Sequence, residues 1–152
     1  MGDAYVNSGQ YVKAIESYLK AIKFKHDFHE AYYNMGVAYA NLGQYENAIK
    51  SCQNAIDIKS DYHEAYNNMG VSYANLGQKG QALQCYLKSQ ALGGDAYNLA
   101  CWYAVEGQKT EALRWLRQAL DKQQISLTHL AQDADWDGLR EDAEFKALVA
   151  NY

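Results

Sequence analysis

The sequence contains no proline, and this absence bears directly on secondary structure. Proline removes a backbone N–H donor and clashes with the preceding turn, so it interrupts helices. A chain without proline that is rich in Ala, Leu and Tyr can be helical along its whole length. The composition therefore favours an all-α protein, and 152 residues suit one domain with a sizeable core.

A basic charge balance and a long apolar segment are also missing. The net charge is −4, whereas nucleic-acid-binding surfaces are basic, so no nucleic-acid partner is expected. No apolar run approaches the roughly 20 residues that cross a bilayer, and no charged start precedes an apolar core. We therefore expect no membrane insertion and see no signal peptide. Cys52, Cys85 and Cys101 are widely spaced without a C-x-x-C pair, which predicts reduced thiols in a cytoplasmic protein.

Signatures of catalysis are absent as well. The chain has no glycine-rich phosphate loop and no Ser–His–Asp pattern. His29 and His63 are each followed by a glutamate and lie 34 residues apart. A side chain that recurs in this way is typical of a structural position, whereas a catalytic site is usually unique. The sequence therefore predicts a protein that is not an enzyme and needs no cofactor.

A repeated pattern fills most of the chain. Four stretches align: MGDAYVNSGQYVKAI from Met1, MGVAYANLGQYENAI from Met35, MGVSYANLGQKGQAL from Met69 and LACWYAVEGQKTEAL from Leu99. Their starts are 34, 34 and 30 residues apart. Such a period with this internal pattern predicts repeated helical hairpins.

Each repeated residue type has a physical explanation. Gly36 and Gly70 are expected where the two helices of a hairpin approach closely, beside Ala48 and Ala82. Glycines at 9, 43, 77 and 107 should end the first helices in the left-handed conformation. The tyrosines at 39, 73 and 103 should pack between hairpins, and the second helices carry an apolar stripe such as Ile49, Cys52 and Ile56.

The series small–x–x–Tyr–x–x–x–Gly–x–x–x–x–Ala at this period resembles the tetratricopeptide repeat (TPR). The resemblance covers residues 1 to about 122 and implies a right-handed superhelical solenoid of antiparallel helix hairpins. About three and a half repeats are implied in a single domain: a partial one at 1–28, others at 29–62, 63–94 and 95–122, and a C-terminal helical cap at 123–152. The proline that usually closes each hairpin is replaced by His26 and Ser60. Four residues are missing around 92–95, which should shift the last hairpin.

The first copy begins at Met1 in the middle of its first helix. Six residues that precede Met35 have no counterpart there, so the chain is either a fragment or has an incomplete first hairpin. In both cases the N-terminal edge lacks a cap, and repeat arrays need polar caps to stay monomeric. One hypothesis is therefore an assembly or scaffold protein that forms homo-oligomers through this edge.

The resemblance also implies a concave groove, lined by the first helices, that holds extended peptides or partner helices. Two residues before each small residue stands an asparagine: Asn34, Asn68 and Asn98. An asparagine ladder, which also occurs in TPR proteins that bind extended polypeptide, offers donors and acceptors to a peptide backbone. Asparagine is unfavourable inside a helix, which leaves a binding role or an interhelix hydrogen bond as explanations.

A second row of asparagines, at 7, 41 and 75, closely precedes the turn glycines, so capping explains it as well as binding does. The predicted peptide-binding face comprises Tyr33, Asn34, Val37, Asn41, Asn67, Asn68, Val71, Asn75, Tyr97 and Asn98. It has no Lys or Arg in the central hairpins, and Glu30 and Glu64 lie on its rim. A clamp for a terminal carboxylate is therefore not expected. The predicted partner is an uncharged or slightly basic extended segment of a protein or peptide.

The stretch DADWDGLREDAE at 133–144 matches the calcium-loop pattern at Asp133, Asp135, Asp137, Gly138 and Glu144. A calcium loop of this kind requires long flanking helices and an apolar residue at the position that Arg140 occupies here. From residue 96 onward the chain also resembles the terminal unit of bacterial TPR proteins, which implies a cap anchored by Leu139 and Phe145. We interpret Asp133 and Asp137 as residues at helix starts. Weak cation binding by Asp133, Asp135, Asp137 and Glu144 is the alternative.

Overall fold

The computed structural model describes residues 9–152, and the regular structure in this range is entirely helical. The residues expected to form the first helix of the first repeat, including Gly2, Tyr5 and Asn7, lie outside the described residues. The chain divides into two compact units between Gly93 and Gly94. This division falls at residues 92–95, a connection as long as the one at 59–62, so the four residues missing from the last repeat period are lost from the helices on either side. Each unit is described by itself.

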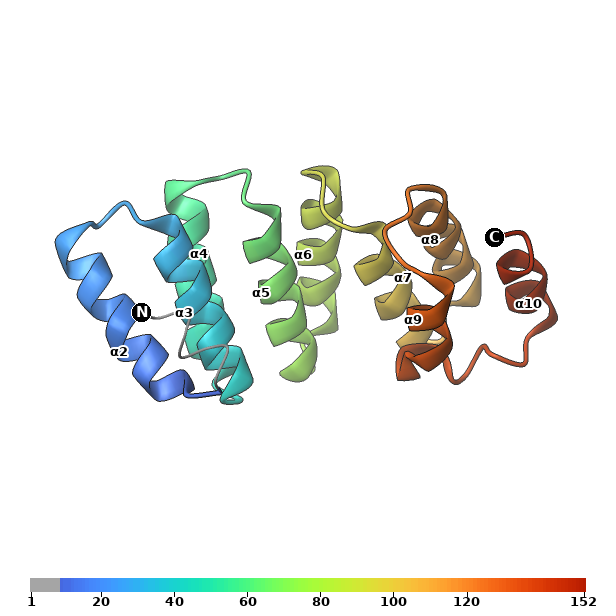
Figure 1. Ribbon diagram of the computed structural model, residues 1–152, viewed down its shortest axis with the longest axis horizontal. Helices are drawn as coiled ribbons and strands as arrows, with labels where there is room; N and C mark the ends of the chain where they lie inside the picture. Colours follow the sequence, from blue (N-terminus) through green and yellow to red (C-terminus); the bar gives the residue numbers. More distant parts are fainter. Residues whose placement is uncertain (1–8) are drawn as a thin grey trace. The chain divides into compact units, whose positions relative to one another are not determined.

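Unit 1 is built from helix hairpins (Figure 1). Helix α3 pairs with α4, α5 pairs with α6, and α2 packs on α3 while α4 packs on α5. The helices are α2 (Tyr11–Phe24), α3 (His29–Asn41), α4 (Tyr45–Ile58), α5 (His63–Asn75) and α6 (Lys79–Ala91). The first helices of two successive hairpins, α3 and α5, also contact each other directly. Each hairpin lies within a repeat range predicted from the sequence.

The turns inside the hairpins depend on glycine. Gly43 and Gly77 have φ values of +71° and +73°, a conformation that side chains with a Cβ rarely adopt. Beyond Gly43 the backbone N–H of Gln44 donates to the carbonyl of Tyr39 at 2.9 Å, which closes the end of α3. None of helices α2–α6 has a side-chain hydrogen bond at its N-cap. Their stability therefore depends on packing more than on capping.

Small residues permit the close approach of the two helices in each hairpin. A Cβ at Gly36 would lie 2.7 Å from Cys52 Sγ and 3.2 Å from the carbonyl oxygen of Ala48. At Gly70 the nearest atoms belong to the Tyr86 ring, at 2.8 Å, rather than to Ala82 as the sequence suggested. The larger tyrosine reaches across the hairpin where a smaller residue stands in the other copy.

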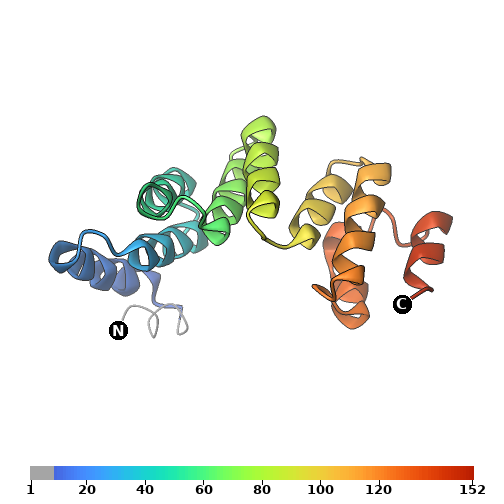
Figure 2. The same ribbon diagram turned by 90° about the horizontal axis from the view of Figure 1, so that it is seen from above.

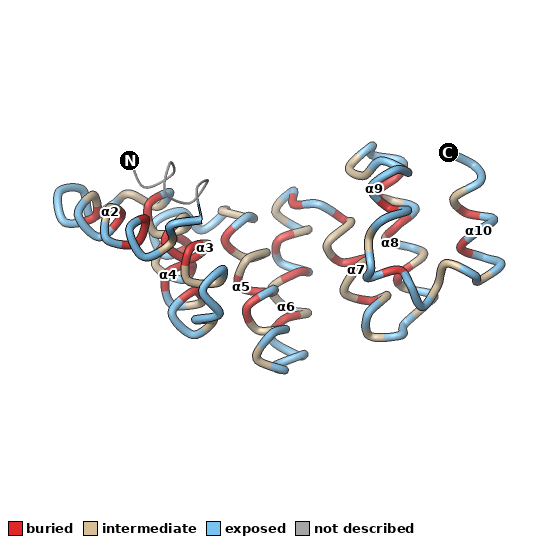
Figure 3. The backbone as a smooth tube through the Cα atoms, turned by 60° about the horizontal axis from the view of Figure 1, so that its bottom comes forward, coloured by how far each residue is buried: buried red, intermediate tan, exposed pale blue. Residues whose placement is uncertain are grey.

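The core of unit 1 follows the predicted stripes. Figure 3 shows helices that are buried on one side and exposed on the other. In α2 the buried stripe includes Ile15, Tyr18 and Ile22, and in α4 it includes Cys52 and Ile56. Tyr39 packs on the core between α2 and α3, and Tyr73 on the core between α4 and α5, as predicted.

Unit 2 contains one hairpin and a short helical cap. Helices α7 and α8 pair closely, as α5 and α6 do in unit 1 (Figure 2). The elements are α7 (Ala96–Val105), α8 (Lys109–Asp121), α9 (Leu127–Gln132), the 3-10 helix η1 (Ala134–Trp136) and α10 (Ala143–Val149). Helix η1 packs on α7, and α10 packs on α8 across a hollow of about 470 Å³.

The cap is anchored by Trp136, which the sequence interpretation did not single out. Its side chain is fully buried and stacks on Phe145 with ring centroids 5.5 Å apart. Phe145 is buried as predicted, and Leu139 is half-buried. Side chains cap all three short elements: Ser126 for α9, Asp133 for η1 and Asp142 for α10.

One predicted helix cap in this region is wrong. Asp137 follows η1 instead of starting a helix, and its carboxylate accepts a hydrogen bond from Arg140 Nε at 2.8 Å. The helix start belongs to Asp142, whose carboxylate accepts bonds from the backbone N–H groups of Glu144 and Phe145. Separately, a search of the described helices finds none that is long and apolar enough to cross a membrane.

Candidate functional site

Eight of the ten predicted groove residues lie on α3 and α5 of unit 1. The spacing of Tyr33, Val37 and Asn41 places them along one side of α3, and the same spacing recurs on α5. Asn34 and Asn68 are half-buried, while Val71 is 41% exposed. Because α3 and α5 are in contact, the two rows of the predicted face lie on neighbouring helices within unit 1.

Two side-chain oxygens on α5 stand out on this face. Among the described residues, three buried side-chain polar atoms have no hydrogen-bond partner: Oδ1 of Asn67, Oδ1 of Asn68 and Nε1 of Trp115. Two of the three therefore belong to adjacent asparagines of the predicted binding face. A buried amide oxygen without a hydrogen-bond donor destabilises the folded protein by about 1–3 kcal/mol. Two such oxygens on neighbouring residues are therefore candidate acceptors for a hydrogen bond from a ligand.

The second row of asparagines serves the helix ends. Asn41 Nδ2 donates to the carbonyl oxygen of Val37 at 2.8 Å, and Asn75 Nδ2 donates to that of Val71 at 2.9 Å. Each bond joins a side chain to the carbonyl one turn earlier in the last part of the same helix, so the amide donor is engaged within its own helix. For Asn41 and Asn75 the capping explanation therefore accounts for the amide donors.

Tyr33 belongs to a group of rings where α3 and α5 begin. Its ring centroid lies 5.1 Å from that of Tyr62, which precedes α5. Burial raises the pKa of Tyr33, with Cys52 and Glu64 adding to the shift. The hydroxyl is therefore neutral at ordinary pH, and this part of the face is aromatic and bordered by carboxylates.

In unit 2 the structure gives Tyr97 a different role from Tyr33. Tyr97 donates to Asp133 Oδ2 at 2.6 Å and accepts a hydrogen bond from Trp136 Nε1 at 3.1 Å. Both bonds join α7 to the cap, so the hydroxyl of Tyr97 has both its donor and an acceptor site engaged within the chain. Asn98 lies beside it on α7 and is half-buried. The sequence signal that could have indicated this contact is the single tryptophan among the aspartates of the tail.

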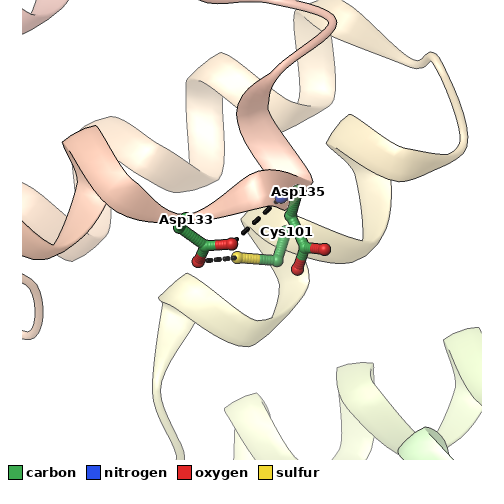
Figure 4. Close-up of side chains that lie close together, drawn as sticks. All are labelled: Cys101, Asp133 and Asp135. Carbon is green, nitrogen blue, oxygen red and sulfur yellow. Dashed lines mark hydrogen bonds between the residues drawn. The ribbon is translucent and has the colours of Figure 1, made fainter.

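The residues of the calcium-loop pattern do not converge. Asp133 and Asp135 lie close together, but Cys101 of α7 is the third member of their cluster (Figure 4). Asp137 pairs with Arg140, and Glu144 accepts a hydrogen bond from Lys109 Nζ at 2.8 Å. The pattern therefore does not bring its four acidic side chains to one point, and an EF-hand loop is not formed.

Hydrogen bonds account for the geometry of the cluster in Figure 4. Asp133 Oδ1 accepts from the backbone N–H of Asp135 at 3.0 Å, and Oδ2 accepts from Tyr97 and from the Cys101 thiol at 3.7 Å. Burial alone would raise the pKa of Asp133, but these donors outweigh it and hold the pKa below its usual value. Burial and the neighbouring Asp133 raise the pKa of Asp135. Asp133 is thus a carboxylate that the protein itself satisfies.

Four family models match the chain in series. They are described as TPR repeat at residues 2–43 and as tetratricopeptide repeat at 29–62, 63–92 and 96–129. Together they cover the four aligned sequence copies and the helix hairpins of both units. The chain belongs to the tetratricopeptide repeat family.

Solved structures of TPR proteins resemble this chain. A crystal structure of MamA is 28% identical, with a TM-score of 0.72, over 81% of this chain and 74% of that one. The second TPR of Spaghetti (RPAP3) bound to the HSP90 peptide SRMEEVD is 28% identical, with a TM-score of 0.59, over 60% of this chain and 84% of that one. The second TPR domain of human RPAP3 with the HSP70 peptide SGPTIEEVD has the same identity and TM-score over 60% and 77%. A search of curated protein sequences finds no match.

The thiols of this TPR chain are poorly suited to nucleophilic chemistry. Burial raises the pKa of Cys52 to about 12, with Cys85 adding to the shift, and raises that of Cys85 to about 11. Burial is also the main cause that raises the pKa of Cys101 to about 12. A reactive cysteine needs a thiolate, so these side chains behave as packing residues. The family and its structural neighbours are typically interaction modules without catalytic activity.

Proposed function

We propose that this TPR protein is a non-catalytic interaction module that binds an extended peptide segment of a partner through Asn34 and Asn68 of unit 1. The observation that carries the proposal is the pair of unpartnered oxygens on Asn67 and Asn68. The remainder of each side chain is half-exposed, and the terminal torsion of asparagine is soft. Rotation of the amide can therefore present the oxygen to a backbone N–H of a bound peptide.

The charge of the face supports a ligand unlike those of the RPAP3 structures. Those structures hold peptides that end in EEVD, a strongly acidic sequence. Helices α3 and α5 contain no lysine or arginine that could pair with such carboxylates, and Glu30 and Glu64 stand in their first turns. The proposed ligand is accordingly an uncharged or slightly basic segment with apolar side chains.

A displayed library of random 12-residue peptides, selected on the wild-type protein, supplies the ligands for the test. The double variant N34A/N68A should weaken binding of the selected peptides by about 30-fold, because two hydrogen bonds are worth about 1 kcal/mol each. The matched control is Asn54→Ala on the second helix α4, which should bind like wild type. Unchanged binding by the double variant, or the failure to select any peptide, would refute the proposal.

A second candidate function is self-association through α2. Three large apolar side chains on this helix are exposed: Val12 at 59%, Leu19 at 51% and Phe24 at 91%. Burial of such side chains between two copies would stabilise a dimer. Light scattering should then show a concentration-dependent dimer that the Phe24→Glu and Leu19→Glu variants dissolve. A monomer at millimolar concentration would exclude self-association and would leave the proposed peptide-binding function unaffected.

A further inference from the structure

The starts of α3 and α5 form a group of three aromatic rings. His29 and Tyr62 meet edge to face, with centroids 5.1 Å apart and planes at 81°, and Tyr33 lies at the same centroid distance from Tyr62 with planes at 56°. All three side chains are half-buried. Tyr33 and Tyr62 pack against the apolar core between α4 and α5. This contact holds one side of each ring in place, while part of the ring remains accessible.

Two carboxylates flank this ring group. Glu30 and Glu64 occupy equivalent places in successive repeats, and their side chains are 56% and 46% exposed. Burial raises the pKa of Tyr62 to about 12, and both Glu64 and Glu30 add to the shift. Glu30 Oε1 also lies 3.7 Å from Nε2 of His29 in the ring group, and both carboxylates add negative potential at the Tyr62 hydroxyl.

The ring of Tyr62 already attracts a cation from the chain itself. Lys59 Nζ lies 4.9 Å from its centroid, and the equivalent Lys25 Nζ lies 5.2 Å from the Phe28 ring one repeat earlier. A cation over a tyrosine face is attracted by the ring quadrupole. Tyr62 differs from Phe28 because two glutamates, one from each repeat, act on it. It is therefore the more strongly cation-attracting of the two rings.

We propose that Tyr33, Tyr62, Glu30 and Glu64 form a pocket for a lysine or arginine side chain of the partner peptide. The inference rests on the proposed function, since the peptide must lie along the same face. An arginine suits the pocket best, because its planar group can stack on tyrosine while donating to carboxylates. An acidic side chain at this place would face Glu30 and Glu64 and be repelled.

The test uses the peptides selected from the random library. They should be enriched in Arg or Lys at one position, and a synthetic peptide with Gln at that position should bind about tenfold more weakly than its basic parent. The E30Q/E64Q variant should bind the two peptides with similar affinity. Raising the salt concentration from 50 to 500 mM should weaken binding of the basic peptide to the wild-type protein but not to E30Q/E64Q. The matched control is the E46Q variant on α4, which should still bind the basic peptide more tightly than the glutamine peptide.

Two results overturn the inference, and they are distinguishable from a failure of the proposed function. Selected peptides that have no basic position but still need Asn34 and Asn68 for binding would refute the pocket alone. A preference that survives in E30Q/E64Q would do the same. The Lys59→Gln variant provides an independent check. Removal of this internal cation should increase the affinity for the basic peptide and leave the affinity for the glutamine peptide unchanged.

Discussion

The hydroxyl of Tyr97 gives the sharpest test of how the cap is held. The substitution Tyr97→Phe removes one oxygen and leaves the ring in place. Asp133 loses a donor, and a hydrogen bond to a charged group is worth about 1.5–3 kcal/mol. Trp136 Nε1 loses its acceptor, which adds about 1 kcal/mol because the side chain is fully buried. The free energy of unfolding of unit 2 should therefore fall by about 3 kcal/mol.

Urea denaturation followed by tryptophan fluorescence measures this loss in the right part of the molecule. All three tryptophans, Trp102, Trp115 and Trp136, belong to unit 2. With a denaturant slope of about 1 kcal/mol/M for a unit this small, the midpoint should shift by about 3 M. The control is Tyr103→Phe, because the buried Tyr103 hydroxyl makes no hydrogen bond to a described residue. Equal midpoints for the two variants would show that the Tyr97 bonds do not hold the cap.

Three further predictions concern packing, pH and metal binding. Gly36→Ala should destabilise unit 1 by about 1–3 kcal/mol because its Cβ meets Cys52, whereas the control Gly80→Ala, which meets nothing, should stabilise it by about 0.5 kcal/mol; thermal unfolding by far-UV circular dichroism would measure both. The pKa of Asp133 is lower in the folded state, so its contribution to stability is complete above the unfolded pKa of about 4 and is lost as the pH falls through the folded pKa. The urea midpoint of wild type should therefore drop below pH 4, and less so in Tyr97→Phe. Titration with millimolar calcium should give no heat that saturates at a one-to-one ratio, because Arg140 and Lys109 hold Asp137 and Glu144 apart from Asp133.

Repetition made the architecture predictable from sequence. Four aligned copies averaged out local ambiguity, so the hairpins, the turn glycines and the stripe through Ile15, Tyr18 and Ile22 follow from the pattern. The cap has no second copy to compare with. The sequence alone therefore does not identify Trp136 as the anchor of the cap, and the helix start that it predicts at Asp137 lies at Asp142. A single local pattern fixes which side chains could cap a helix, but the packing decides which one does.

The same limit applies to the predicted binding residues, where side chains at one repeat position have three different environments. Tyr33, Asn67 and Tyr97 are equivalent in the alignment. The Tyr33 ring packs at a tilt against that of Tyr62, Asn67 keeps an unpartnered oxygen, and Tyr97 is hydrogen-bonded to Asp133. The period fixes where such a side chain lies on its helix, while its partners come from whichever element packs beside that helix. A ligand contact is therefore best sought where the neighbours leave a polar atom unsatisfied. By that criterion, substitutions of Asn67 and Asn68 on α5 should reduce peptide binding without reducing the stability of the fold.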